Sequence, residues 1–411
     1  MKLRWTLIVV LAQAGAVTML HAQKGGPEHW VATWTTAQLL VRTPPPAQTV
    51  AARGFYQQTV RMIVRTSIGG KRLRIRLSNS FGSAPVSVGA AHVAIRSKDS
   101  AIVPGSDRPL SFNGQTGCTI GPGAVLLSDP VDLDVPPLGD LAVSLYFPGE
   151  TGPPATHATA LHRTYVVEGD STGQAAMPDA TTTQSYYYLA DVEVLAPADA
   201  ALIVAFGDSI TDGARSTTET NHSWPALLAA RLGANKATAR LAVGNMGIGG
   251  NRLLRDGSGA SALARLDRDA LSQPGVKWLM LLEGINDIGH GATVPEEAVS
   301  AGDLIGAYRQ IIERAHAQGI KVIGCTLTPY EGANYYRENG EAIREALNNW
   351  IRTSGAFDAV VDFEAGARDR DNPKRFRAEF DPGDHLHPND DGYQAMADAV
   401  DLAIFTGKRA K

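Results

Sequence analysis

The stretch LIVAFGDSITDGAR, residues 202–215, decides the fold of this chain. Residues 202–206 form an unbroken apolar run, which predicts a strand buried on both faces of a sheet. The run ends at Gly207, Asp208 and Ser209, where small and polar residues turn the chain. Open α/β sheets bind ligands at the carboxyl ends of their strands, so we expect the Ser209 hydroxyl to lie at such an edge. A lone serine in this position is more often a helix cap, so its chemistry depends on what else reaches the edge.

The rest of the C-terminal half alternates between apolar runs and segments with helical periodicity. The apolar runs are 239–243, 278–282, 321–326 and 359–363, and the helical segments are 223–232, 261–271, 301–318, 340–354 and 392–405. Strand–helix alternation of this kind predicts a parallel sheet with helices on both faces. We therefore predict an α/β domain over residues 197–411.

Residues 29–196 show short strand-like runs separated by glycine, proline, asparagine and aspartate turns. This pattern predicts an all-β, sandwich-like domain. Two of its runs, 59–66 and 71–79, are joined by the link Ser-Ile-Gly-Gly at 67–70, which is typical of a β-hairpin.

Two features of this β-rich half are candidates for an accessory binding role. Arg72, Arg74 and Arg76 alternate with apolar residues, which predicts one buried face and one basic face. Aromatic residues gather at Trp30, Trp34 and 186–188. The arginines either contact acidic sugars or form a solvated outer face, and the aromatic rings either stack on sugars or belong to the core.

Composition and the N-terminus narrow the class of protein. The chain has 411 residues and a formal net charge of −4, which gives no support to nucleic-acid binding. Residues 1–22, with Lys2 and Arg4 before an apolar run, resemble a signal peptide, with an uncleaved anchor as the alternative. No later segment is apolar enough to cross a bilayer, so we expect a secreted or periplasmic protein with no stable membrane insertion after cleavage. Cys118 and Cys325 are its only cysteines and fall in different predicted domains.

Several polar stretches follow the later strands of the predicted sheet and would arrive at the edge that holds Ser209. A glycine-rich stretch at 244–251 follows the second strand, and Asn286 follows the third. The glycine spacing does not match a phosphate-binding loop. Asp384 and His387 lie three residues apart near the C-terminus, close enough for the carboxylate to orient the imidazole.

A metal site is the alternative reading of the C-terminal stretch, with Asp384, His385 and His387 as ligands. No further His, Cys or Glu cluster supplies a matched ligand set, so we expect neither a catalytic metal nor a cofactor.

Four stretches, FGDSITDG, NMGIGGN, EGINDI and DHLHP, occur in this order over residues 197–411. In this order and spacing they resemble the signature blocks of the SGNH (GDSL) hydrolases. The resemblance implies a three-layer α/β catalytic domain in which Ser209 is the nucleophile, His387 the base and Asp384 the residue that orients it. It also implies an oxyanion hole from the backbone N–H of Ser209, the backbone N–H of Gly250 and the side chain of Asn286.

Within that hole, Gly249 is the alternative to Gly250. We choose Gly250 because it precedes Asn251, where the family has a glycine before a polar residue.

The stretch TLTPYEG at 326–332, the helix that follows it and the Thr33-Trp34 strand resemble an acetylxylan-esterase-like branch of the superfamily. That resemblance implies removal of acetyl or other short acyl groups from polysaccharides or sugars, so the expected partner is an acylated carbohydrate or another small ester. The alternatives are a general short-chain arylesterase or lipase, and a glycan-binding protein with an inactive hydrolase domain.

Overall fold

The computed structural model describes residues 27–39 and 50–406, so the predicted signal peptide lies outside the described residues. A five-stranded parallel sheet carries the C-terminal half, in the order β18-β17-β19-β20-β21. Its strands are β17 (Ala201–Gly207), β18 (Leu241–Gly247), β19 (Val276–Leu282), β20 (Lys321–Cys325) and β21 (Ala359–Val361). All five apolar runs predicted as strands are therefore confirmed, with shifts of a few residues at their ends.

Strand β17 is completely buried and lies between β18, with which it pairs in continuous register, and β19, with which the register shifts once between Leu202 and Ile203. Its neighbour β18 extends to Gly247, so the first half of the predicted glycine-rich loop is strand instead. A side chain is excluded at Gly247 because a Cβ atom there would lie 2.2 Å from the backbone nitrogen of Asp212. Glycine here serves the close approach of two backbone segments beside Ser209.

The helices fall into two groups by their contacts: α3, α8 and α9 pack together, and α4, α5, α6 and α7 form the second group. The predicted helix over 261–271 continues past its α-helical part as a π-helical turn, Asp267–Leu271. Helix α5 and the short helices α2 and α8 were not predicted from the sequence. The α-helices of this half are α2 (Ser209–Asp212), α3 (Trp224–Ala234), α4 (Ala262–Leu266), α5 (Ile285–Thr293), α6 (Ala301–His316), α7 (Glu338–Thr353), α8 (Phe363–Ala367) and α9 (Asp390–Asp398), with 3-10 turns at Pro295–Glu297, Ala378–Phe380 and Leu402–Phe405.

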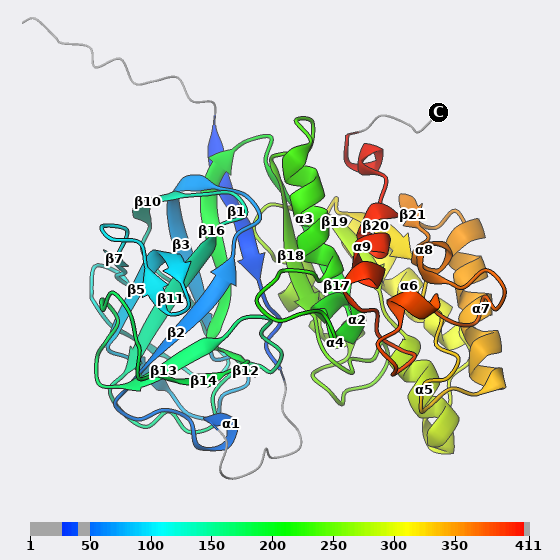
Figure 1. The fold of residues 1–411 in the computed structure, drawn as a ribbon, viewed down its shortest axis with the longest axis horizontal. Helices are drawn as coiled ribbons and strands as arrows, with labels where there is room; N and C mark the ends of the chain where they lie inside the picture. Colours follow the sequence, from blue (N-terminus) through cyan, green and yellow to red (C-terminus); the bar gives the residue numbers. More distant parts are fainter. Residues whose placement is uncertain (1–26, 40–49, 407–411) are drawn as a thin grey trace, which may run out of the picture.

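Two antiparallel sheets make up most of the N-terminal half, which lies beside the parallel sheet (Figure 1). One has the order β1-β16-β3-β10, with β9 on β3, and the other β14-β13-β2-β11-β5-β6, with β7 on β5; β4 pairs with β8 and β12 with β15. Side chains of both large sheets share one apolar core. The elements are β1 (Glu28–Thr35), α1 (Val50–Arg53), β2 (Gln58–Arg65), β3 (Gly70–Ser78), β4 (Val86–Val88), β5 (Ala90–Lys98), β6 (Ala101–Ile102), β7 (Arg108–Pro109), β8 (Cys118–Ile120), β9 (Val125–Leu127), β10 (Val131–Val135), β11 (Asp140–Phe147), β12 (Thr156–His157), β13 (Thr164–Glu168), β14 (Thr181–Thr183), β15 (Tyr186–Tyr187) and β16 (Leu189–Pro197).

The predicted hairpin between residues 59–66 and 71–79 is wrong. Strand β2 pairs with β11 and β13, whereas β3 pairs with β16, β10 and β9 in the other sheet. The link between them is held by β1 instead, because Ser67 N–H donates to the Thr33 carbonyl at 2.9 Å and the Thr33 hydroxyl donates to the Ile68 carbonyl at 2.6 Å. A glycine pair after a strand permits this sheet-to-sheet crossing as readily as a tight turn.

The predicted alternation of β3 is confirmed, but its arginines do not form a free basic face. Arg74 pairs with Glu193 at 2.7 Å, Arg76 with Asp191 at 3.0 Å and with Glu193, and Arg72 with Asp132 at 2.8 Å. The Arg74 guanidinium also lies over the Trp30 ring, 4.3 Å from its centroid. Both candidate sugar-binding features are thus engaged with the protein itself.

The aromatic residues 186–188 lie in the core: Tyr186 is 6%, Tyr187 2% and Tyr188 0% exposed. Trp34 packs edge-to-face against Tyr186, with ring centroids 4.9 Å apart. The three tyrosines are accordingly core residues, and Tyr186 and Trp34 also line a cavity between the two halves.

Strand β1 joins the two halves by packing against β18 and β17. The Ala32 N–H donates to the Pro274 carbonyl at 3.0 Å, the Thr35 hydroxyl to the Asn245 carbonyl at 3.2 Å, and the Val243 N–H to Ser67 Oγ at 3.2 Å. One apolar core runs through both halves. The β-rich half is therefore built onto the edge of the parallel sheet and is not tethered by a linker alone.

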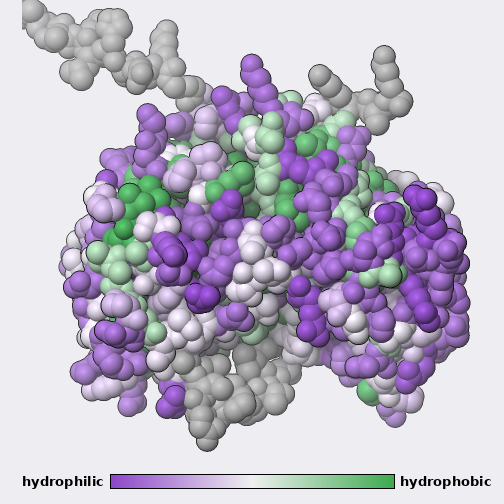
Figure 2. Space-filling view, in the orientation of Figure 1, coloured by the Kyte–Doolittle hydropathy of each residue, from purple (hydrophilic) through white to green (hydrophobic). Residues whose placement is uncertain are grey.

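Hydrophilic residues cover most of the face seen in Figure 2, and apolar residues appear there only in scattered patches. Among the described residues, no helix combines the length and the apolar character needed to cross a bilayer. Both cysteines are free thiols, Cys118 half-buried and Cys325 buried.

Glu219 makes the interface between the halves sensitive to acid. It accepts hydrogen bonds from the Arg96 guanidinium and the Arg163 N–H, both at 2.6 Å. Burial acts to raise the pKa of Glu219, but hydrogen bonds from His162, Arg163 and Arg96 prevail and lower it from 4.5 to about 2. Its stabilising contribution is fully present above pH 4.5 and is lost as the pH falls toward 2.

We predict that Glu219→Gln lowers the free energy of unfolding at pH 7 and that its difference from the unmodified protein shrinks as the pH falls from 5 to about 2. Urea unfolding across this pH range measures the difference. Glu150→Gln, at an exposed position, is the matched control and should show no such trend. A Glu219→Gln effect that stays constant with pH would contradict this role.

Candidate active site

Ser209 occupies the first position of the single helical turn α2, directly after the carboxyl end of β17. The Asp208 carboxylate caps this turn by accepting the Ile210 N–H at 2.9 Å. Gly213 ends the turn in a left-handed conformation with φ of 107°, which residues with a side chain rarely adopt. As the first residue of a helical turn, Ser209 leaves its backbone N–H without an intrahelical acceptor.

The Ser209 hydroxyl, the His387 ring and the Asp384 carboxylate form one chain of hydrogen bonds. Ser209 Oγ lies 2.7 Å from His387 Nε2, and His387 Nδ1 lies 3.0 Å from Asp384 Oδ2. An ionised carboxylate can only accept, so Nδ1 carries the proton and Nε2 presents its lone pair to the hydroxyl. The structure therefore brings these predicted residues together in the order that proton transfer from serine requires.

Asp384 is held in its ionised form by several donors. Burial acts to raise its pKa, but the backbone N–H groups of His387 and Leu386, the His387 ring and the Arg215 guanidinium together hold the pKa of Asp384 well below its usual range. Arg215 Nε lies 2.8 Å from Asp384 Oδ2. Sequence reasoning missed Arg215, which lies at the end of the stretch that carries Ser209.

His385 lies two residues from His387 but belongs to a different contact. Its Nδ1 is bonded to Asp381 Oδ2, and its side chain is 47% exposed. Only His387 of these two neighbouring histidines therefore contacts Ser209.

Asn286 lies in the first turn of α5 and its amide orientation is set by two neighbours. Its Nδ2 donates to the Asn251 carbonyl at 2.9 Å, and its Oδ1 accepts the Tyr335 hydroxyl at 3.3 Å. An amide nitrogen has two hydrogens, so the second remains for a ligand. In the part of the chain described, the backbone N–H groups of Gly249 and Gly250 donate to no protein acceptor.

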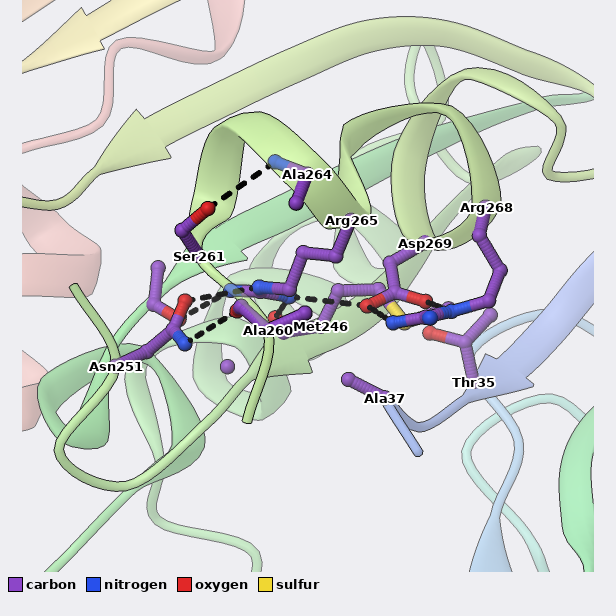
Figure 3. Close-up of polar contacts among 12 residues, drawn as sticks. Thr35, Ala37, Met246, Asn251, Ala260, Ser261, Ala264, Arg265, Arg268 and Asp269 are labelled. Atoms are coloured by element: carbon purple, nitrogen blue, oxygen red, sulfur yellow. Dashed lines mark hydrogen bonds and ion pairs between the residues drawn. The ribbon is translucent and has the colours of Figure 1, made fainter. Parts of the chain in front are cut away.

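Arg265 is the buried centre of the contacts beneath this site (Figure 3). Its guanidinium donates to the Gly207 carbonyl at 2.8 Å, the Met246 carbonyl at 2.7 Å and Asn251 Oδ1 at 2.9 Å. These acceptors belong to the end of β17, the end of β18 and the loop that carries Gly250. One fully buried side chain thereby ties the turn that bears Ser209 to the loop that orients Asn286.

Sequence reasoning missed Arg265 because it is one of several charged residues in a predicted amphipathic helix, and the pattern does not show which of them is buried. Its counter-charges are Asp269, at 3.4 Å, and Glu283, at 3.8 Å. Its guanidinium also lies over the Phe206 ring at 4.0 Å from the centroid.

Two acidic side chains beneath the site are shifted toward their neutral form. Burial raises the pKa of Asp208 to about 7, against the hydrogen bond from Ile210. Burial and the neighbouring Asp208 raise the pKa of Glu283 well above its usual value, with Arg265 acting in the opposite direction. Neutral carboxyl groups do not repel negative charge that develops on a ligand oxygen above them.

Within residues 27–39 and 50–406, no group of three His, Cys, Asp or Glu side chains is arranged to hold a metal ion. The predicted alternative of Asp384, His385 and His387 as a ligand set does not form, because His385 turns to Asp381.

Comparison with known proteins adds the family. Residues 205–395 match the model of the GDSL-like Lipase/Acylhydrolase family. No curated protein is significantly similar to the chain in sequence.

Among solved structures, a putative lipolytic protein of the G-D-S-L family from Desulfitobacterium hafniense is 23% identical, with 50% of this chain and 99% of that chain covered and a TM-score of 0.37. An acetyl xylan esterase, AlAXEase, is 24% identical over 48% of this chain and 96% of that chain, with a TM-score of 0.37. A catalytic mutant of the acetylxylan esterase Axe2 from Geobacillus stearothermophilus is 19% identical over 48% and 91%, with a TM-score of 0.38.

The family match confirms the resemblance found in the sequence: residues 205–395 form a domain of the SGNH/GDSL hydrolase superfamily. It is a carboxylic-ester hydrolase of that superfamily.

We predict that Arg265→Lys destabilises the protein by about 3 kcal/mol and lowers kcat. A lysine keeps the charge, but its three N–H donors share one nitrogen and cannot reach the acceptors that Arg265 contacts through three different nitrogens. Each buried acceptor left unpaired costs about 1–3 kcal/mol. Urea unfolding measures the first effect, and ester hydrolysis well below the unfolding midpoint measures the second. Arg268→Lys, on the neighbouring and more exposed arginine, is the control. Unchanged activity in folded Arg265→Lys would contradict the tie between the two loops.

Proposed function

We propose that this protein is a serine esterase in which Ser209 is the nucleophile, His387 the general base and Asp384 the residue that orients it. The proposal depends on one observation, the continuous path from Ser209 Oγ through the His387 ring to Asp384, with contacts of 2.7 and 3.0 Å. We further propose that the N–H groups of Ser209 and Gly250 and the Asn286 amide form the oxyanion hole. The catalytic domain would then place its parallel sheet between two layers of helices.

In the first half of the reaction, His387 Nε2 takes the hydroxyl proton as Ser209 Oγ bonds to the ester carbonyl carbon. The carbonyl π electrons move onto oxygen, and the three N–H donors stabilise the resulting anion. When the tetrahedral intermediate collapses, the bond to the alcohol oxygen breaks, and that oxygen takes the proton from His387. The acyl group remains on Ser209.

In the second half, water replaces the alcohol. His387 Nε2 takes a proton from water as its oxygen attacks the acyl carbon. Collapse releases the carboxylic acid, and Ser209 Oγ takes its proton back from His387. The ionised Asp384 stabilises the imidazolium that forms in both halves.

We propose short acyl groups, most of all acetyl, on polysaccharides or sugars as the substrates. The support is the sequence resemblance of residues 326–332 and of the Thr33-Trp34 strand to the acetylxylan-esterase-like branch. The signal-like residues 1–22 support export, which would place the enzyme where polysaccharides are found. An inactive glycan-binding protein is disfavoured, because such a protein would have no need for the aligned hydroxyl, imidazole and carboxylate.

Two histidine variants test the assignment of the base. We expect His387→Ala and Ser209→Ala each to lower the kcat for p-nitrophenyl acetate by at least about 10⁴-fold, because the nucleophile and base act as a unit. His385→Ala, two residues away and turned to Asp381, is the matched control and should keep most of the activity. Equal losses in the two histidine variants would refute the assignment.

Removal of one oxyanion donor is expected to cost less. Asn286→Ala should lower kcat by about 10²–10³-fold with little change in KM, because the anion exists only in the transition state and intermediates. Steady-state kinetics on the same substrate measures both constants. A loss confined to KM would place Asn286 in ground-state binding instead.

Acetate release from acetylated xylan, compared with hydrolysis of p-nitrophenyl octanoate, tests the substrate class. We expect the acetylated glycan to have the higher kcat/KM, with Ser209→Ala as the blank. A clear preference for octanoate would favour the lipase alternative.

A further inference from the structure

His157 is a buried, titratable side chain that the β-rich half extends toward the catalytic half. It lies on the short strand β12, which pairs with β15, and its side chain is 4% exposed. Its Nδ1 lies 2.8 Å from the Ala37 carbonyl oxygen and its Nε2 lies 3.0 Å from Asp212 Oδ1. Asp212 is the last residue of α2, the turn that begins with Ser209.

The two contacts of the His157 ring limit which of its nitrogens carry a hydrogen. A carbonyl oxygen can only accept, so Nδ1 must carry a hydrogen. The contact with Asp212 then needs one more proton, either on Nε2 or on the carboxyl group. Burial acts to lower the pKa of His157, but the Asp212 carboxylate and the two hydrogen bonds prevail and raise it. A raised pKa favours the imidazolium form of His157, and a hydrogen bond between an imidazolium and a carboxylate is of the stronger, charge-assisted kind.

Asp212 is fixed to the nucleophile turn by its backbone. Its N–H donates to the Asp208 carbonyl at 2.9 Å, which closes the turn around Ser209. Its carbonyl accepts the Asn245 amide at 3.2 Å. Gly247 packs directly against its backbone nitrogen on the other side. A displacement of Asp212 therefore moves the turn as a unit and with it the Ser209 hydroxyl.

We propose that His157 is a positioning residue for Ser209: by holding the Asp212 carboxylate, it keeps the nucleophile turn where Oγ reaches His387 Nε2. This inference depends on the proposed function, because it requires Ser209 to be the nucleophile. It makes the β-rich half part of the catalytic apparatus and not a separable binding module. A misplacement of about 1 Å can cost about 10²-fold in rate, so a small shift of the turn has a measurable effect.

The surroundings of the pair allow a clean substitution. A cavity of about 100 Å³ lies between the two halves, and its lining includes His157, Asp212, Arg65 and Asn221. A cavity of that size holds several water molecules when its lining is polar. A shorter side chain at position 157 would accordingly admit water beside Asp212 and leave that carboxylate free to move.

Two amide variants separate the two contacts of the ring. In His157→Gln the side-chain amide reaches the position of Nε2 and can still donate to Asp212, whereas in His157→Asn it reaches only the position of Nδ1 and can still donate to Ala37. We expect His157→Asn to lower kcat for p-nitrophenyl acetate by about 10–100-fold with KM within about twofold. His157→Gln should recover kcat to within about fivefold of the unmodified enzyme. Each loses one of the two hydrogen bonds, so their melting temperatures should fall by similar amounts.

His29→Asn is the matched control. His29 also joins the two halves through a ring nitrogen, 3.1 Å from the Ala200 carbonyl, but at the opposite end of β17 from Ser209. This variant should leave kcat unchanged. Asp212→Ala supplies a second route if His157→Asn folds poorly: it should reproduce the loss in kcat, and the double variant should fall no further than either single one.

Equal kcat values in His157→Asn and His157→Gln would overturn the inference, as would additive losses in the double variant or an equal loss in His29→Asn. If the proposed function were wrong, Ser209→Ala and His387→Ala would instead retain esterase activity. Loss of activity in those two variants together with unchanged kcat in His157→Asn would refute the positioning role alone.

Discussion

The carboxyl end of β17 is the constraint on which the rest of the site depends. This strand is an inner strand of the parallel sheet, paired with β18 on one side and with β19 on the other, so the segments that follow these three strands must emerge side by side. They carry Ser209, the glycine-rich loop and Asn286. Arg265 holds the ends of β17 and β18 and the loop together through backbone carbonyls and Asn251. The order of the strands therefore brings the site residues together, and the loops only adjust their positions.

Buried charge gives this arrangement its rigidity. Arg265 beneath the site is fully buried, and removing an ion from water is expensive unless it is paired and hydrogen-bonded. Each contact that compensates for that expense also fixes a direction in space. The buried contact between His157 and Asp212 fixes a direction in the same way at the interface between the two halves. The buried polar contacts in the core therefore fix the positions of the site residues.

Predictions from the sequence succeeded where the signal was local. Apolar runs located all five strands of the parallel sheet, and periodicity located the longer helices α3, α6 and α7. They failed where a local pattern fits two tertiary outcomes. The Ser-Ile-Gly-Gly link at 67–70 can close a hairpin or cross between sheets, and its contacts with Thr33 select the crossing. Glycines at 244–247 suggest a loop but form strand, because β17 offers a partner in register.

The sequence by itself determined the resemblance to the family and the candidate site residues. Ser209, Asn286, Asp384 and His387 stand in short motifs whose spacing is readable without coordinates, and the distance between Asp384 and His387 is set by a three-residue loop. Only the tertiary structure decided which residues support them. Arg265 meets acceptors on three separate segments, and His157 meets partners 120 and 55 residues away. Such contacts leave no periodicity in the chain, because they are created by packing between segments and not by the local geometry of the backbone.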